Sequence, residues 1–197
     1  MTERPTTVAA VVLAAGGGRR YGMPKALVEY EGSLLVERAV RTARAVCDPV
    51  LVVLGARAVD VWRQADLDGA TVLANRDWET GMASSLRTGL EGLRGWPGRI
   101  DAALVTLVDM PGMTPEALAR VSGHASPDAL AVAAYDGVRG HPVLLGRDHW
   151  VGVLESLTGD EGARRYLSAH GATEVDCTGL ADPTDLDVPP SGVPSAP

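Results

Sequence analysis

The segment VAAVVLAAGGGRRYGMPK, residues 8–25, indicates how this chain folds. It begins with the apolar run Val8–Ala14 and passes almost at once into three glycines, Gly16–Gly18. An uninterrupted apolar run of this length, bounded by glycine, is typical of a strand that is buried on both faces. A glycine-rich turn at the carboxyl end of the first strand is where parallel sheets bind phosphate groups. The segment therefore predicts a parallel sheet with an anion site at its edge.

The rest of the chain repeats the same alternation of buried strands and amphipathic helices. We expect further strands at Pro49–Leu54, Ala70–Ala74, Ala102–Val108, Ala129–Ala134, His141–Gly146 and Thr173–Cys177. We expect helices at Leu34–Val46 (with Ser33 as its N-cap), Ala58–Ala65, Gly81–Leu93, Thr114–Val121, Asp148–Leu157 and Glu161–His170. The turn signal Tyr135-Asp136-Gly137 predicts one antiparallel element. The predicted fold class is α/β: a three-layer Rossmann-like domain with a mostly parallel sheet.

Length and composition place this fold in one globular domain. The 197 residues, 46% of them hydrophobic, suffice for a single core. We expect one domain over residues 1–187, followed by a disordered Pro-rich tail at 188–197. The two cysteines, Cys47 and Cys177, form no disulfide framework and no clustered metal site, and are expected to be free thiols.

The acidic charge balance excludes whole classes of partner. Lys and Arg total 18 against 25 Asp and Glu, which gives a formal net charge of −7. A nucleic-acid-binding protein usually shows a basic excess or stripe, and an anionic membrane surface is disfavoured for the same reason. No apolar stretch approaches the ~20 residues that a membrane span requires. We therefore expect a soluble cytoplasmic protein that binds neither nucleic acid nor membrane.

The glycine-rich turn matches neither of two common phosphate-binding motifs. The dinucleotide fingerprint G-x-G-x-x-G fits Gly16 and Gly18 but fails at Tyr21. The P-loop motif requires Lys directly after its last glycine, whereas Met-Pro precedes Lys25 here. What remains is a turn that carries Arg19, Arg20 and Lys25 in an acidic chain. The cluster favours an anionic ligand over the alternative, a purely structural turn with solvated basic residues.

The turn resembles the signature L-A-A-G-x-S-x-R-M-G-x-x-K of the MobA-like nucleotidyltransferases, which include the molybdenum-cofactor guanylyl- and cytidylyltransferases. More distantly it is similar to sugar-phosphate and methylerythritol-phosphate nucleotidyltransferases. Two positions depart from the signature: Gly18 stands where Ser is usual, and Tyr21 where Met is usual. The resemblance covers about 190 residues and implies the nucleotide-diphospho-sugar transferase type of fold.

The resemblance implies transfer of NMP from an NTP to a phosphorylated acceptor with release of pyrophosphate. Arg20 and Lys25 would then be the catalytic cations that stabilise the charge developing on the phosphates. The remaining nucleotide-binding positions of the turn would be Leu13, Ala14, Ala15, Gly16, Gly17 and Gly18.

A divalent metal, Mg²⁺, is the cofactor expected for this chemistry. Asp109 follows a predicted buried strand in the string V-D-M-P, which resembles the family's metal-binding D-x-P. The C-terminal string Asp185-Leu186-Asp187-Val188-Pro189 resembles the family's D-I-D-T-P, and either aspartate could complete the site. We favour Asp187 over Asp185; the alternative is a solvated terminus.

The segment that follows the third strand resembles the cytidylyl branch of the family. It carries Asn75, Gly81, Ser84 and Ser85 in the pattern N-x-x-W-x-x-G-M-x-x-S, at the predicted start of a helix. We expect these four residues to bind the nucleotide, with CTP favoured over GTP. The alternative is an N-cap beside a core Trp.

Two further strings, Gly140-His141-Pro142 and Gly159–Arg164, resemble the G-H-P and G-D-x-G-A-R of the same branch. We expect His141 and Arg164 to bind the acceptor, which the resemblance implies is molybdopterin. A molybdoenzyme is a further expected partner. Two alternatives stay open: a sugar phosphate or other phosphorylated metabolite as acceptor, or a non-catalytic factor that binds nucleotide or cofactor for molybdoenzyme maturation.

Overall fold

The computed structural model describes residues 5–186 and contains a seven-stranded sheet in the order β5-β4-β1-β6-β8-β7-β9. Within this sheet, as far as the structure describes it, only β8 runs antiparallel to its neighbours, β6 and β7. All other pairings in this sheet are parallel. The strands are β1 (Val8–Ala14), β4 (Val50–Leu54), β5 (Thr71–Ala74), β6 (Ala102–Leu107), β7 (Leu130–Tyr135), β8 (Val138–Gly146) and β9 (Thr173–Asp176). The predicted α/β class with one antiparallel element is confirmed.

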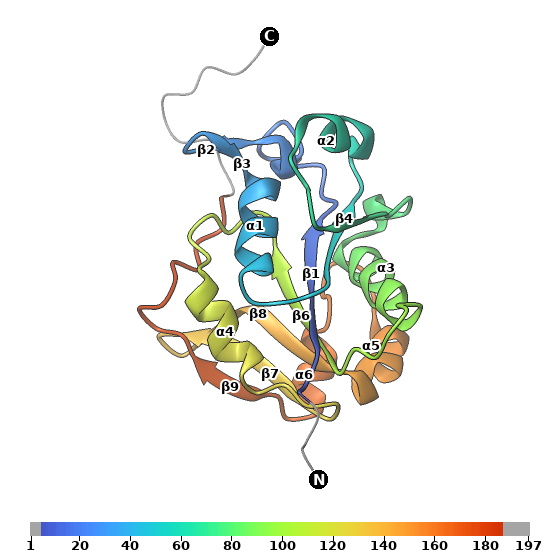
Figure 1. Cartoon of the computed structure of the whole chain (residues 1–197), viewed down its shortest axis with the longest axis vertical. Coiled ribbons are helices and arrows are strands. Elements are labelled where there is room, and N and C mark those ends of the chain that lie inside the picture. Colours follow the sequence, from blue (N-terminus) through green and yellow to red (C-terminus); the bar gives the residue numbers. More distant parts are fainter. Residues whose placement is uncertain (1–4, 187–197) are drawn as a thin grey trace.

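Helices cover both faces of this sheet and make three layers (Figure 1). One layer contains α1 (Leu35–Arg44), α2 (Ala58–Gln64) and α4 (Pro115–Ser122), and the other contains α3 (Met82–Arg94), α5 (Trp150–Ser156) and α6 (Arg164–Ala169). Thr114 caps α4, because its Oγ1 accepts a hydrogen bond from the backbone N–H of Ala117.

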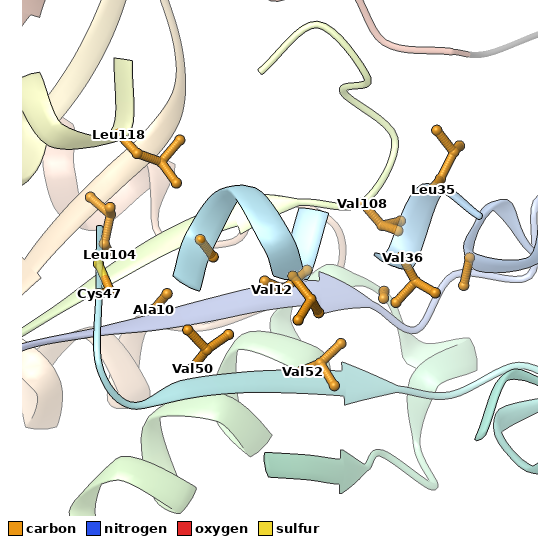
Figure 2. Packing of buried hydrophobic residues seen from close by; sticks show 14 of the residues in the cluster. Ala10, Val12, Leu35, Val36, Cys47, Val50, Val52, Leu104, Val108 and Leu118 are labelled. Atoms are coloured by element: carbon orange, nitrogen blue, oxygen red, sulfur yellow. The ribbon is translucent and has the colours of Figure 1, made fainter. Parts of the chain in front are cut away.

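The central strand β1 supplies side chains to both cores. Ala10 and Val12 face the layer of α1, and Figure 2 shows Ala10 beside Val50 and Val12 beside Val52 and Val36. The alternate β1 residues, Ala9, Val11 and Leu13, face the layer of α3. The five residues Ala9–Leu13 are at most 7% exposed. This burial explains why β1 is apolar throughout, since a strand covered on both sides has no polar face.

Three predicted boundaries are wrong, each for a local reason. Ser33 is not the N-cap of α1, because it pairs with Tyr30 in a two-stranded hairpin of β2 (Glu29–Tyr30) and β3 (Ser33–Leu34). The helix instead begins after Leu34, whose N–H donates to the Glu37 carboxylate at 3.0 Å. Glu37 thus reaches back to the N–H of the residue that precedes the helix, which is the glutamate half of a capping box.

The second and third corrections concern β8 and α6. β8 begins at Val138 rather than at His141, because Asp136 and Gly137 adopt positive φ and form a tight turn that lets pairing resume at once. α6 begins at Arg164 rather than at residue 161, because Gly162 has a φ of 54° and interrupts helical backbone.

The β2–β3 hairpin and α2 lie together at the end of the molecule where β1 terminates, at the top of Figure 1. Three short 3₁₀ helices complete the described elements: η1 (Lys25–Leu27), η2 (Trp78–Thr80) and η3 (Arg147–His149). No helix within residues 5–186 is both long enough and apolar enough to cross a membrane. The expected tail, 188–197, lies outside the described residues.

Both thiols should resist modification in the folded protein. Cys47 is 5% exposed and Cys177 is fully buried, and burial raises the pKa of Cys47 to about 12. At pH 8 that group is protonated, and the thiolate is the form that reacts. We expect no reaction with a disulfide-exchange reagent at pH 8 over minutes, and reaction of both thiols in guanidinium chloride. Rapid labelling of either cysteine in the native protein would contradict this burial.

Candidate functional site

The site lies at the carboxyl ends of β1 and β6, where the order of the strands across the sheet reverses. β1 is flanked by β4 on one side and β6 on the other, so the connections that leave their carboxyl ends diverge. Parallel sheets bind ligands in the crevice that such divergence creates. Lys25 comes from the connection after β1, in η1, and Asp109 comes two residues after the end of β6.

An ion pair joins these two connections. Lys25 Nζ lies 2.8 Å from Asp109 Oδ2, and the two side chains are only 15% and 21% exposed. The partners are 84 positions apart in the sequence, so only the sheet brings them together. Each partly buried charge is compensated by the other, whereas an isolated buried ion would have no such compensation.

A cavity of about 390 Å³ opens over this pair. Its walls are the glycine-rich turn, the ion pair and the beginning of α3. Ten of the expected site residues line it: Leu13, Ala15, Gly16, Gly17, Gly18, Arg20, Lys25, Gly81, Ser85 and Asp109. We call it the glycine-rich cavity.

The glycine-rich turn requires glycine at Gly18. This residue has a φ of 62°, and a Cβ there would collide with the carbonyl oxygen of Met23. The backbone N–H of Gly22 donates to the Gly18 carbonyl at 2.8 Å and closes the turn. The departure from the usual Ser is therefore demanded by the shape that the turn adopts here.

Trp78 supports the same turn from the side, which the sequence did not reveal. A Cβ at Gly17 would come within 2.9 Å of its indole, and one at Gly55 within 2.5 Å of its Cβ. The half-buried Trp78 also lines the glycine-rich cavity. Glycine at these two positions lets the indole lie flat against the turn.

Asn75 is buried and organises the start of α3. Its Nδ2 lies 2.8 Å from Ser84 Oγ and 3.0 Å from Ser85 Oγ, and its Oδ1 accepts the N–H of Asp77 at 2.9 Å. Ser84 Oγ also lies within 3.0 Å of the carbonyls of Asp77 and Gly81. Asn75, Ser84 and Ala14 were expected to bind the nucleotide. They line neither the glycine-rich cavity nor the larger cavity beside it, which is described next. Ser85 does reach the glycine-rich cavity.

A second, larger cavity of about 860 Å³ adjoins the first and contains His141 and Arg164. We call it the β8 cavity. Its floor is apolar and is formed largely by sheet and helix side chains: Leu13, Leu86, Val105, Leu107, Val132, Val143, Leu145 and Leu167. Its charged rim consists of Asp136, Arg139, Asp160, Glu161, Arg164 and Asp185.

His141 is placed by an irregularity in β8. Gly140 pairs with Ala133 and Val143 pairs with Val132, so His141 and the following proline have no partner in the β7 register. Such irregularities re-aim side chains. The Tyr135 hydroxyl donates to the His141 carbonyl at 2.9 Å and holds this backbone in place.

The environment keeps His141 neutral. Loss of solvent lowers its pKa to about 4; the negative charge of Asp109 opposes this shift, and the positive charge of Arg164 adds to it. At neutral pH the imidazole therefore carries one N–H donor and one acceptor nitrogen.

The two cavities share a wall made of Leu13, Met82, Leu107 and Asp160, of which Asp160 alone is charged. Asp160 Oδ1 accepts the N–H of Met82 at 3.2 Å, at the first turn of α3. Sequence reasoning quoted Asp160 within a motif but assigned it no role.

The C-terminal segment lies against Asp109 at Leu186. The N–H of Leu186 donates to the Asp109 carbonyl at 2.8 Å, and Asp185 lines the β8 cavity. The favoured metal ligand, Asp187, lies outside the described residues. Within residues 5–186, no group of three or more His, Cys, Asp or Glu side chains is arranged to hold a metal ion.

Comparison with known proteins places the chain in a family. Residues 10–175 match the MobA-like NTP transferase domain. The chain belongs to the MobA-like NTP transferase family. The expected resemblance is confirmed, and the family is one of nucleotidyltransferases.

Curated relatives of this MobA-like chain carry different names. A protein named nicotine blue oxidoreductase from Paenarthrobacter nicotinovorans is 34% identical, over 91% of this chain and 92% of that protein. A probable molybdenum cofactor guanylyltransferase from Geobacillus is 29% identical, over 67% and 66% of the two chains. The molybdenum cofactor cytidylyltransferase of Escherichia coli is 22% identical, over 70% and 69%.

Solved structures share the fold of this MobA-like chain. The Rv0371c protein of Mycobacterium tuberculosis superposes with a TM-score of 0.81 at 29% identity, covering 93% of this chain and 94% of that one. A second structure of Rv0371c, described as a complex with manganese, gives a TM-score of 0.76. The inositol-1-phosphate CTP transferase of T. maritima superposes with a TM-score of 0.74 at 16% identity, over 95% of this chain and 92% of that one. It therefore shares the fold.

The glycine-rich turn yields a stability prediction that is independent of any ligand. Gly18 and Gly22 both have positive φ, but only at Gly18 would a Cβ strike neighbouring backbone. Gly22→Ala should lower the free energy of unfolding by about 1 kcal/mol, the usual strain of a left-handed residue. Gly18→Ala should lower it by at least about 2 kcal/mol, because backbone must also move. Equal losses for both variants in urea titrations would contradict the turn geometry described here.

Proposed function

We propose that this protein transfers a nucleotidyl group, with CMP favoured over GMP, from an NTP to the phosphate of molybdopterin or the molybdenum cofactor, releasing pyrophosphate. The observation that carries the proposal is the Lys25–Asp109 ion pair, 2.8 Å long, at the crevice between β1 and β6. It provides one cation and one carboxylate at the position where a phosphate and its metal would bind.

The glycine-rich turn is suited to the triphosphate. Gly16–Gly18 have no side chains to keep phosphates away from backbone N–H groups. Arg20 and Lys25 line the same cavity and add positive charge. Such groups, fixed before the reaction, stabilise charge that develops on the transferred phosphate and on the leaving pyrophosphate.

The donor set fits Mg²⁺ bound through the substrate. Mg²⁺ is usually held by one or two carboxylates plus substrate phosphates, rather than by a protein cage. Asp109 supplies such a carboxylate, and Leu186 ties the segment leading to Asp187 beside it. When bound, Mg²⁺ would neutralise negative charge on the phosphates. Lys25 would then exchange its contact with Asp109 for one with a phosphate oxygen.

Ser85 is the residue best placed to contact the base. It is 5% exposed, lines the glycine-rich cavity and lies within hydrogen-bonding distance of Asn75 Nδ2. With Asn75 as the donor, the Ser85 hydroxyl can donate its own proton to an acceptor on the nucleobase. The preference for CTP rests on the likeness of this segment to the cytidylyl branch.

The β8 cavity supports a fused heterocycle with a single phosphate as the acceptor. Its apolar floor would bury a planar ring system, as ligand pockets of several hundred Å³ commonly do. Arg139 is already paired with Glu174 at 2.7 Å, whereas Arg164 has no ion-pair partner among residues 5–186. One available cation suits one phosphate. A sugar phosphate has no apolar ring face of this kind, so it would leave the apolar floor of the β8 cavity uncovered.

A second candidate function, a reductase of a heteroaromatic compound, is favoured by one observation. The relative named nicotine blue oxidoreductase aligns over nine-tenths of both chains. The apolar β8 cavity would accept a planar heteroaromatic compound as readily as a pterin. A reductase requires a hydride donor such as a nicotinamide cofactor, so the two functions differ in a measurable co-substrate.

Pyrophosphate release tests the proposal. With Mg²⁺, molybdenum-loaded molybdopterin and either CTP or GTP, we expect turnover that is faster with CTP. Lys25→Ala and Asp109→Ala should each lower kcat at least about a hundredfold, the scale of losing one group that stabilises the transition state. Asp60→Ala is the matched control, because its carboxylate also binds a cation, Arg57 at 2.7 Å, on exposed α2.

Asp60→Ala should keep the wild-type unfolding transition, whereas Lys25→Ala and Asp109→Ala, which leave the partner charge unpaired, should lower it while the proteins stay folded at the assay temperature. Absence of pyrophosphate release with every NTP, alongside tight CTP binding, would replace the enzyme by the alternative of a non-catalytic binding factor. Oxidation of NADH in the presence of a heteroaromatic acceptor, without pyrophosphate release, would instead support the reductase.

A further inference from the structure

We propose that Asp160 is a positioning residue that couples the glycine-rich cavity to the β8 cavity. It does so by binding the beginning of α3, on the nucleotide side, to the segment from which α6 begins, on the acceptor side. The role of the two cavities rests on the proposed function, whereas the mechanical link rests on contacts alone.

The link is made by residues 157–163, the α5–α6 segment. It meets α3 through two hydrogen bonds: Met82 N–H to Asp160 Oδ1 at 3.2 Å, and Ala83 N–H to the Gly159 carbonyl at 2.9 Å. The first N–H groups of a helix have no partners within the helix, so a carboxylate placed there is favourable. The segment thus satisfies the orphan donors of a helix that is distant in sequence.

The fit between the segment and α3 is close. Gly81, which precedes α3, has a φ of 110°, and a Cβ there would lie 2.5 Å from Asp160 Oδ1 and 2.6 Å from the Gly159 carbonyl oxygen. On the other side, Gly162 has a φ of 54°, and a Cβ there would lie 3.2 Å from Met82 Sδ. The segment and the start of α3 therefore approach each other closely at two glycines, where a larger residue would not fit without a shift.

The other end of the segment is the beginning of α6. The Arg164 N–H donates at 3.1 Å to the carbonyl of Glu161, which is the residue that follows Asp160. A shift of Asp160 is thus transmitted through one residue to the helix that carries Arg164. Since Asp160 is the charged residue common to both cavity walls, ligands in either cavity change its surroundings. Such coupling is reciprocal by thermodynamic linkage.

Hydrogen–deuterium exchange of the ligand-free protein tests the link. In Asp160→Ala, we expect amide exchange to accelerate about fivefold both at residues 82–84 and at 164–167, the scale of losing one helix cap. Asp160→Asn should restore slow exchange, because its Oδ1 still accepts the Met82 N–H.

Glu161→Ala is the matched control. This substitution removes the same charge from the next position. The native Glu161 pairs with Arg165 at 3.7 Å and, of the two cavities, lines only the β8 cavity. The substitution should accelerate exchange in α6 about twofold and leave α3 unchanged. Faster exchange in Asp160→Ala at α3 alone, or failure of Asp160→Asn to restore it, would overturn the link.

A second arm adds CTP and Mg²⁺. In the wild-type protein we expect slower exchange at residues 82–84 and at residues 164–167. In Asp160→Ala we expect slower exchange at residues 82–84 only. A purely local role of Asp160 would not produce this difference. Protection of α3 without α6 in the wild-type protein would overturn the coupling. Protection at neither site would instead refute the proposed nucleotide site, while the ligand-free arm still decides the link.

Discussion

The Lys25–Asp109 ion pair is the contact on which the organisation of the site depends. It joins the connection after β1 to the connection after β6, at the point where the two leave the sheet in different directions. Without a charge on the other side, either group would be costly to hold at such low exposure. The same pairing keeps a carboxylate and a cation side by side, which is what the proposed function requires of a metal ligand and a phosphate ligand.

The two cavities differ in chemistry as well as in size. The glycine-rich cavity presents backbone and cations, which suits a highly charged group, whereas the β8 cavity presents an apolar floor and one available arginine. In the β8 cavity, His141 stays neutral although Asp109 and Arg164 both act on it. The relatives bear the names of a transferase and of an oxidoreductase, in keeping with the rule that a fold does not by itself fix the chemistry.

Local sequence signals predicted most of the elements, and the errors concern where elements begin. The apolar run of β1 and a helix that opens at Thr114 were confirmed, since buried strands and capping hydroxyls leave direct marks in a sequence. Ser33 has the right residue type for a cap, but it pairs in the β2–β3 hairpin and the Glu37 carboxylate binds the N–H that precedes α1. The beginning of α6 is displaced by the left-handed backbone of Gly162, and the sequence does not tell which glycines adopt that conformation.

The sequence by itself determined the alternating α/β pattern, the glycine-rich turn after β1 and the resemblance that the family match confirms. These features follow from periodicity and motif spacing, which are local. Only the tertiary structure decided that Lys25 pairs with Asp109, that Gly18 cannot be Ser in this turn, and that Asp160 separates two cavities. The first and third depend on distances between segments that are far apart in the sequence, and the second on the path of the backbone from Gly18 to Met23. Neither kind of geometry has a signature in the order of the residues.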